Sequence, residues 1–307
     1  MRMTTIVAAL LLLLVAVPAA LAQENRGLVF VFQKQKDPAK IQAHAQKVSE
    51  FLSAELGVPV KTIVPGDYSA SVQAIISKQA DFAYVSAIPF LLARRDGGAT
   101  ILLAEVRRDA AGKDRNDYDS IIVVRKNSPL QNFEDLKAKA SELRLVFTSP
   151  TSTSGYIMPY ARFVSEGMLQ AKQDPKTIFK SVAFGGGYTQ ALEQLLAGKA
   201  DAAAVSDYVL EGPKADVYLK TEQRQELRIL ARTSGVPTHL ICARGGLDDG
   251  LKAKVKAAMH KLAREKPELL ADVYGASSFA EVDENVHVKK AIQAVESSGL
   301  PIEGLAK

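Results

Sequence analysis

The residues best suited to chemistry form a Thr-Ser-Thr-Ser run at residues 151–154, followed by Gly155. The apolar segment 143–148 before the run predicts a strand, and the spacing of apolar residues over 156–167 predicts a helix after it. At the start of a helix, several backbone N–H groups lack a partner within the helix, and the helix dipole is positive there. Added hydroxyl donors make such a place suit a tetrahedral or pyramidal oxyanion. We therefore expect this hydroxyl run to contact an oxyanion.

A second interpretation of the run is structural. One hydroxyl would cap the helix, and the others would belong to an ordinary turn. A single cap accounts for one hydroxyl, whereas this run holds four and is followed by a glycine. Neutral donors would also let an anion leave again, as a carrier requires. We therefore favour binding over capping alone.

The segments that must position this run alternate between strand and helix patterns, which is typical of an α/β fold with largely parallel sheets. Apolar residues at helical spacing predict helices at 38–56 and 69–78, and Pro89 predicts the start of a short helix. After Gly246 the pattern is helical almost to the end of the chain. β-rich runs predict strands at 28–32, 58–64, 81–85, 101–106, 121–125, 143–148, 178–183, 200–205 and 227–231.

One stretch of the chain occurs in two similar copies. Residues 68–86 align without a gap on residues 188–206, and both copies begin with Tyr and end in Ala-Asp-x-Ala-x-Val-Ser. Generic helix and strand composition is the alternative explanation. A true repeat predicts two similar lobes, whose ligand lies beyond the carboxyl ends of the strands. The residues that would then face the cleft are Tyr68, Ser86, Tyr188 and Ser206.

Several motifs together resemble the phosphate, phosphite and phosphonate binding proteins of ABC importers, over nearly the whole chain after the first residues. They are Gly112-Lys113-Asp114, Tyr118-Asp119-Ser120 with the apolar run to Arg125, Phe133 to Lys137, and Ser152 to Tyr156 with Pro159. The resemblance implies a two-lobed periplasmic-binding-protein fold of type II, in which two hinge strands link lobes of mostly parallel sheet flanked by helices. The first lobe would comprise residues 23–117 and 235–307, and the second lobe residues 118–234.

The same resemblance implies a set of ligand-binding residues. Ser152, Thr153 and Ser154 match the oxyanion ligands, and Tyr68 and Tyr84 would approach from the first lobe. Tyr84 has an alternative as an ordinary strand aromatic, and Ser120, which begins the crossing strand, has one as a turn former. The expected set is completed by Ser120, Ser86 and Asp207.

Two positions depart from the family pattern. Where members often carry a histidine before a second-lobe helix, this chain has three glycines and then Tyr188. Where members commonly place an aspartate after a proline, this chain offers His239. A phenol donates a hydrogen bond but carries no positive charge near neutral pH. We expect His239 to supply the positive or proton-donating contact that Tyr188 cannot, the alternative being a buried strand residue bonded to backbone.

The first residues have the pattern of a secretory signal peptide at 1–22. Arg2 precedes an apolar run at 6–17, which is too short to span a membrane, and the segment closes on Ala-Leu-Ala. No cysteine follows for a lipid anchor, so we expect a periplasmic protein. The single cysteine, Cys242, allows no internal disulfide and reads as a buried strand residue.

These observations favour a substrate-binding component of an ABC importer that binds phosphite, phosphonate or phosphate. An oxyanion sensor, for example of arsenite, that docks on a membrane histidine kinase is the alternative, although Cys242 is badly placed for thiolate capture. A hydrolase of anionic esters is disfavoured, because the chain has no G-x-S-x-G, P-loop or H-E-x-x-H motif. The net charge of +5 is scattered, which disfavours nucleic-acid binding. We expect a monomer without metal or cofactor.

Overall fold

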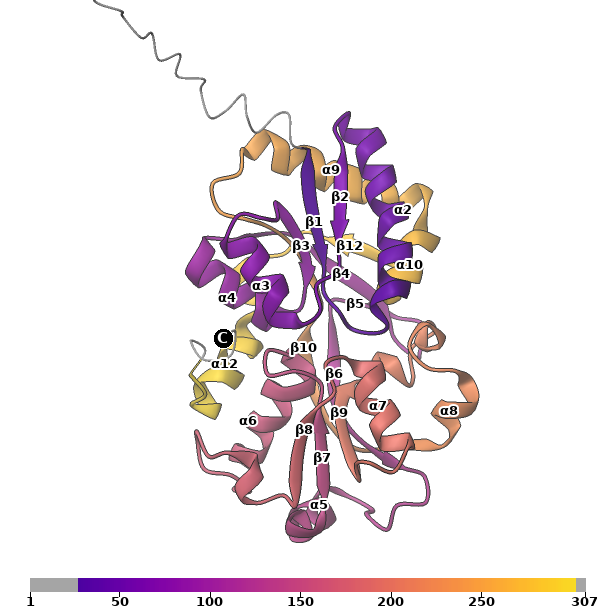
Figure 1. The fold of residues 1–307 in the computed structure, drawn as a ribbon, viewed down its shortest axis with the longest axis vertical. Coiled ribbons are helices and arrows are strands. Elements are labelled where there is room, and N and C mark those ends of the chain that lie inside the picture. The colour runs from indigo at the N-terminus through magenta and orange to yellow at the C-terminus, as the bar shows by residue number, and fades with distance from the viewer. Residues whose placement is uncertain (1–26, 302–307) are drawn as a thin grey trace, which may run out of the picture.

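The protein, described over residues 27–301 by a computed structural model, forms two α/β lobes, each built around its own sheet (Figure 1). The predicted two-lobed fold is confirmed. The segment predicted to be a signal peptide, residues 1–22, lies outside the described residues. Within the described range, none of the helices has the length and apolar character needed to cross a membrane.

The first lobe is built on a mixed sheet. In order across it, the main strands are β12 (Ser278–Ala280), β4 (Thr100–Arg108), β11 (Leu240–Ala243), β3 (Phe82–Val85), β1 (Leu28–Phe32) and β2 (Val60–Ile63), and β5 (Asp114–Arg115) pairs with β4. β1 runs parallel to β2 and β3, whereas β11, β4 and β12 pair antiparallel with their neighbours. On one face lie α2 (Pro38–Leu56), α9 (Asp249–Glu265) and α10 (Pro267–Tyr274), and on the other α3 (Tyr68–Ile76) and α4 (Ala87–Gly97).

The second lobe has a five-stranded sheet. Its strands, in order, are β10 (Leu227–Pro237), β6 (Asp117–Arg125), β9 (Ala202–Ser206), β7 (Arg144–Phe147) and β8 (Ser181–Phe184). β7 is parallel to β8 and β9, and β6 is antiparallel to β9 and β10. Both sheets are therefore mixed rather than mostly parallel: β11 and β12 run opposite to the other main strands of the first lobe, and β6 runs opposite to the other strands of the second lobe. The second-lobe helices are α5 (Phe133–Ala138), α6 (Met158–Ser165), α7 (Tyr188–Leu196) and α8 (Thr221–Gln225), with short helical turns η1 (Ala140–Glu142), η2 (Thr153–Ile157), η3 (Pro175–Thr177), η4 (Asp207–Val209) and η5 (Ala215–Val217).

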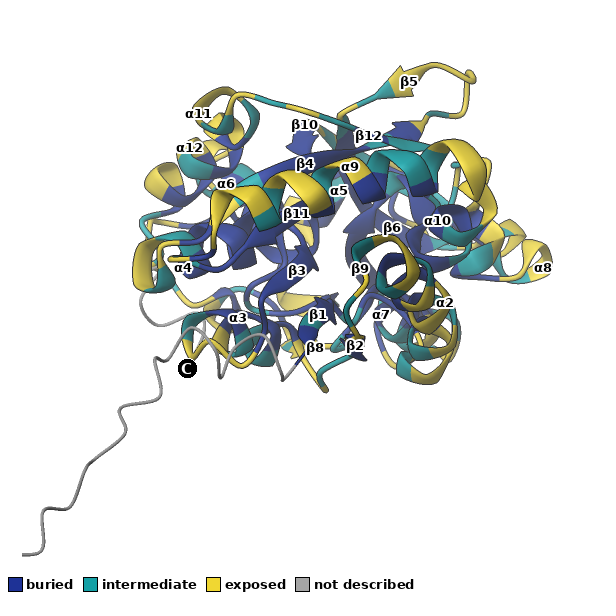
Figure 2. Ribbon diagram, turned by 90° about the horizontal axis from the view of Figure 1, so that it is seen from above, coloured by how far each residue is buried: buried dark blue, intermediate teal, exposed yellow. Residues whose placement is uncertain are grey.

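Burial follows this layering. All residues of β3, β9 and β11 are buried, as expected of strands covered on both faces, whereas most of β8 is exposed. Figure 2 shows the buried strands inside and exposed residues on the outer turns of α8, α9 and α11 (Glu284–His287). One buried apolar cluster fills the α2, α9 and α10 side of the first lobe. The other runs from the α3 and α4 side into the second lobe.

The chain crosses between the lobes more than twice, whereas two hinge strands were predicted. It passes from β4 to β6 and returns from β10 to β11. After β12 it crosses again, because α12 (Lys289–Ser298) packs against α6, β10 and η2 of the second lobe. The predicted division, which gave all of 235–307 to the first lobe, is therefore wrong for α12. The buried residues of this amphipathic helix meet an apolar second-lobe surface, and the sequence pattern does not say which lobe supplies that surface.

The internal repeat corresponds to one structural unit in each lobe. Each copy begins with a tyrosine at the start of a helix, α3 or α7, and ends in a buried strand, β3 or β9. The aspartate that precedes the strand has the same role in both copies. Asp81 accepts a hydrogen bond from the backbone N–H of Val29 at 3.0 Å, and Asp201 accepts one from that of Arg144 at 2.9 Å. Each carboxylate thus fixes the start of the neighbouring parallel strand.

The predicted bounds of helices and strands agree with the structure where the sequence holds residues that typically begin or end an element. The helix at 38–56 has the predicted bounds, because Asp37 caps it, Pro38 begins it and Gly57 ends it in the left-handed conformation. The strand predicted at 178–183 begins only at Ser181, and the strand predicted at 227–231 continues to Pro237. β12 was missed within the region predicted to be helical, since three residues give too short a pattern.

Candidate functional site

The hydroxyl run lies where β7 ends and η2 begins, and its members have three different partners. Ser152 is the helix cap, and its hydroxyl accepts a hydrogen bond from the backbone N–H of Gly155 at 3.0 Å. The hydroxyl of Thr153 accepts one from the backbone N–H of Ile88, at the start of α4 in the other lobe, at 3.0 Å. Gly155 is required here, since an added Cβ would lie 2.1 Å from the hydroxyl oxygen of Thr148.

Ser154 lies at the centre of a buried group of hydroxyls. Its Oγ is 2.9 Å from the Tyr188 hydroxyl and 3.1 Å from that of Ser206, and it accepts a longer hydrogen bond, 3.4 Å, from Tyr118. The hydroxyl of Ser120 donates to the Ser154 carbonyl at 2.6 Å. All five side chains are buried, with at most 3% exposed. We call this set, Ser154, Tyr188, Ser206, Tyr118 and Ser120, the hydroxyl cluster.

The first lobe closes over this cluster. The backbone N–H of Tyr188 donates to the Gln35 carbonyl at 2.8 Å, and the Tyr218 hydroxyl donates to the Tyr274 carbonyl at 2.8 Å. The side chain of Gln35 accepts from the hydroxyls of Tyr208 and Tyr218, which come from the second lobe. These contacts and the Ile88 bond to Thr153 join the lobes directly.

Tyr68 is the first-lobe counterpart of Tyr188. It is fully buried, and within the described range its hydroxyl has no hydrogen-bond partner. Burial raises the pKa of the Tyr68 phenol well above its usual value, and the nearby Tyr188 adds to this, so Tyr68 is a neutral donor. A buried hydroxyl without a partner is costly, and a ligand oxygen would supply one.

His239 lies in the second crossing and is fully buried. Its ring stacks on Tyr118 with centroids 6.0 Å apart and on Tyr274 at 6.2 Å, with the edges of Tyr84 and Tyr208 also in contact. Burial first, and then Arg107, hold the pKa of His239 well below its usual value. The imidazole is therefore neutral near neutral pH, which leaves the proton-donating form of the predicted contact open, because a neutral ring keeps one donor nitrogen.

Tyrosines dominate this region. Seven of the nine in the chain are buried where the lobes meet, namely Tyr68, Tyr84, Tyr118, Tyr188, Tyr208, Tyr218 and Tyr274. Except for Tyr68, they are linked by ring contacts to one another or to His239. Arg107 lies over the Tyr208 ring at 3.6 Å and forms an ion pair with Glu105. Its charge is thus balanced within the first lobe.

Tyr84, Ser86 and Asp207, also predicted as ligand-binding residues, bond groups outside the hydroxyl cluster. The Tyr84 hydroxyl donates to Glu105, and its ring packs in the α2, α9 and α10 core, as the alternative for this residue stated. The backbone N–H of Ser86 donates to the side-chain oxygen of Gln33, in the same lobe, at 3.0 Å. The Asp207 carboxylate accepts from the N–H of Tyr208 and pairs with Arg232.

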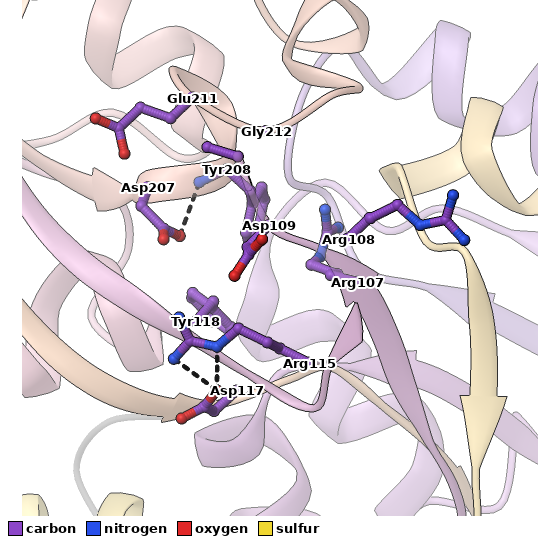
Figure 3. Close-up of a pocket in the computed structure, with 11 residues that line it drawn as sticks. Arg107, Arg108, Asp109, Arg115, Asp117, Tyr118, Asp207, Tyr208, Glu211 and Gly212 are labelled. Atoms are coloured by element: carbon purple, nitrogen blue, oxygen red, sulfur yellow. Dashed lines mark hydrogen bonds and ion pairs between the residues drawn. The ribbon is translucent and has the colours of Figure 1, made fainter. Parts of the chain in front are cut away.

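Asp207 instead lines a small pocket between residues of the two lobes, which we call the rim pocket (Figure 3). The pocket has a volume of about 30 Å³ and a mixed lining that includes Arg107, Arg115, Asp117 and Glu211. Burial raises the pKa of Asp207 to about 6, and the nearby Asp119 carboxylate contributes. Tyr118 lines this rim pocket while its hydroxyl reaches Ser154, so Tyr118 lies between the pocket and the hydroxyl cluster.

Sequence reasoning missed Tyr118 and the two glutamines Gln33 and Gln35 as site residues. Gln33 and Gln35 follow β1, at the same place in the first lobe that the hydroxyl run occupies after β7. The rule that ligands lie beyond the carboxyl ends of strands, applied to both lobes, would have found them. Tyr118 was quoted only as part of a motif, although it immediately precedes Asp119 and Ser120.

The chemistry available here is reversible binding of an anion by neutral donors. The side-chain partners of Ser154 are all hydroxyls, and neither ring nitrogen of His239 bonds a described group. Cys242 is buried, and burial raises its thiol pKa to about 12, so it offers no thiolate. Among residues 27–301 no group of three or more His, Cys, Asp or Glu residues could hold a metal ion.

Known proteins resemble this chain in sequence and in fold. The family model of phosphonate ABC transporter periplasmic substrate-binding proteins matches residues 30–286. The phosphonates-binding periplasmic protein of Escherichia coli K12 is 23% identical over 78% of this chain and 67% of its own length. The probable ABC transporter phosphite binding protein PhnD1 of Prochlorococcus marinus MIT 9301 is 28% identical over 53% of this chain and 52%, about half, of its own length.

Solved structures show the same fold. A binding component of an ABC phosphonate transporter from Pseudomonas aeruginosa superposes with a TM-score of 0.75, at 20% identity, over 88% of this chain and 87% of its own. PhnD1 of Prochlorococcus marinus in complex with methylphosphonate gives 0.74, at 21% identity, over 89% and 98%. The family model covers most of the chain, and the motifs that carry the resemblance fall within it. The chain therefore belongs to the family of periplasmic substrate-binding proteins of phosphonate ABC transporters.

Proposed function

We propose that this protein binds a small phosphorus oxyanion, such as phosphite, methylphosphonate or phosphate, between its two lobes and delivers it to an ABC importer. The hydroxyl cluster carries this proposal. Its hydroxyls bond only one another or backbone, and an oxyanion would replace those O–H···O contacts by stronger hydrogen bonds to a charged acceptor. The names of the relatives, which mention phosphonates, phosphite and phosphate, support the same ligand class.

Closure of the lobes would make the ligand-bound state recognisable to the importer. Tyr68 and Gln35 belong to the first lobe, and the hydroxyl cluster belongs to the second. A ligand that touches both walls favours the closed state, and only such differential contact can shift the equilibrium. We further propose that the protein acts as a monomeric binding protein without catalytic activity, exported by cleavage after Ala22.

A thermal-shift and calorimetry screen tests the proposed function. Phosphite, methylphosphonate and phosphate are compared with sulfate and acetate at equal concentrations. A ligand at one hundred times its Kd stabilises the folded protein by about 2.7 kcal/mol, which raises its Tm measurably. Small-angle scattering of the same samples should show compaction on binding. If only sulfate or acetate binds, or if no oxyanion does, the proposal is wrong.

Export has its own test. Expression of the full chain in a bacterium with a periplasm, followed by N-terminal sequencing of the periplasmic product, should give a chain that begins at Gln23. A protein that stays in the cytoplasm with its first residues intact would contradict the proposed export.

A further inference from the structure

His239 has hydrogen-bonding capacity that no described residue uses. The ring is completely buried, and both its nitrogens lack a partner within residues 27–301. Leaving a buried polar group unpaired costs about 1–3 kcal/mol, so such groups usually have a partner. The ring stacks on Tyr118, whose hydroxyl reaches Ser154, and this places the imidazole beside the hydroxyl cluster.

The groups that face His239 make it neutral. Tyrosines surround it from four elements, Tyr84 from β3, Tyr118 from β6, Tyr208 from η4 and Tyr274 from α10. The nearby charged groups are Arg107 and its partner Glu105, both on β4. Burial and the Arg107 charge hold the pKa of His239 well below its usual value. A neutral imidazole has one donor nitrogen and one acceptor nitrogen.

Among the described residues, no cationic side chain hydrogen-bonds a member of the hydroxyl cluster. Burial raises the pKa values of Tyr68 and Tyr118 well above normal, so both phenols are neutral donors. Arg107 is balanced by Glu105, and Lys36, with a pKa lowered to about 8 by burial, donates to the carbonyl of Asp272. The cost of removing an ion from water grows with the square of its charge, about fourfold from a singly to a doubly charged oxyanion.

Given the function proposed above, we propose that the cleft takes the singly charged form of phosphite or methylphosphonate, which keeps one P–O–H group, and that His239 accepts the hydrogen bond from that group. The remaining ligand oxygens accept from the hydroxyl cluster and from Tyr68. The doubly charged form of either ligand has no P–O–H proton to give to the acceptor nitrogen, and no cationic side chain among the described residues bonds the hydroxyl cluster to receive its second charge. Because phosphate groups lose their second proton near pH 6, this choice matters in the physiological range.

Calorimetry over a range of pH tests this inference with two ligands. Phosphite has a second ionisation in the range, whereas hypophosphite is singly charged throughout and has no P–O–H group. Above its second ionisation, the Kd for phosphite should rise about tenfold per pH unit, with uptake of one proton on binding. The Kd for hypophosphite should stay constant over the same range. Repeating the phosphite titration in buffers of different ionisation enthalpy measures the proton uptake directly.

Two variants locate the accepting group. His239→Leu should weaken phosphite about tenfold and hypophosphite much less, because only phosphite loses a hydrogen bond to the ring. His239→Gln, whose amide keeps a donor and an acceptor, should recover part of the phosphite loss. Circular dichroism and melting curves confirm that each variant folds. If the leucine variant does not fold, the glutamine variant alone is compared with the original protein.

The contrary outcomes are distinct. Phosphite affinity that stays flat or increases with pH means that the doubly charged form binds, and the inference is wrong. An equal pH dependence for hypophosphite means that a protein group titrates instead of the ligand, which also overturns it. Failure of phosphite, methylphosphonate, phosphate and hypophosphite to bind at any pH would overturn the proposed function itself, and this inference with it.

Discussion

The two copies of the repeated unit place matching residues at matching points of the fold, but their hydroxyls have different partners. Tyr188 and Ser206 meet at Ser154, whereas the hydroxyl of Tyr68 has no described partner and Ser86 bonds Gln33. The difference comes from the loop beside each unit. The second lobe has a hydroxyl run after β7, and the first lobe has two glutamines after β1. One wall is thus arranged for an oxyanion beforehand, and the other has donors that a ligand would satisfy.

The largest expected effect is at the second-lobe wall. Ser154→Ala removes the hydroxyl that joins Tyr118, Tyr188 and Ser206, and it should weaken oxyanion binding about 30- to 100-fold, since hydrogen bonds to charged groups contribute about 1.5–3 kcal/mol. Ser86→Ala, at the other wall, is the matched control and should change affinity less than about twofold by calorimetry. Equal losses in both variants would mean that the two walls do not differ as described.

The two tyrosines should separate affinity from stability. Tyr188→Phe and Tyr68→Phe should each weaken binding about tenfold, because each loses one donor to the ligand. Without ligand, Tyr188→Phe should lower the free energy of unfolding by about 1 kcal/mol, since its hydroxyl bonds Ser154. Tyr68→Phe should leave it unchanged or raise it, because the lost hydroxyl had no described partner. Urea unfolding measures both, and a clear destabilisation by Tyr68→Phe would contradict the description of that side chain.

A smaller effect is expected at the contact between lobes. Thr153→Val removes the acceptor for the Ile88 N–H and should favour the open form, weakening binding about three- to tenfold. Small-angle scattering should show a larger radius of gyration without ligand. Thr151→Val is the matched control, because the Thr151 hydroxyl is buried and lacks a described partner. If the two variants behave alike, the bond from Ile88 has no part in closure.

The smallest effect concerns the aspartate that begins the second-lobe strand. Hydrogen bonding to Arg144 holds the pKa of Asp201 below its usual value, so its contribution to stability is present above about pH 4 and is lost as pH falls through the lowered pKa. The pair is partly exposed, so we expect less than about 1 kcal/mol. Urea unfolding of Asp201→Asn should show this deficit near neutral pH and none in strong acid. A deficit that persists in acid would point to the shape of the side chain instead of its charge.

The sequence could predict the α/β class, the repeated unit and the hydroxyl run, because these depend on local patterns. The hydroxyl run follows a predicted strand and the two tyrosines begin helices, so the order of the predicted elements is enough to place them. The side of the sheet on which Tyr84 lies depends on the alternation within β3, which sends it into the core with Phe82. The partners of His239 come from elements far apart in the chain. The return of α12 to the second lobe depends on a surface assembled from distant segments.

The gathering of seven tyrosines where the lobes meet also makes the molecule its own optical reporter. The chain has no tryptophan, so its near-ultraviolet emission comes from tyrosine. Only Tyr156 and Tyr160 lie elsewhere, in the second lobe. An anion that hydrogen-bonds the phenols, or a movement that separates the lobes, would alter most of the emission at once. Occupancy could then be followed in stopped-flow fluorescence without a label.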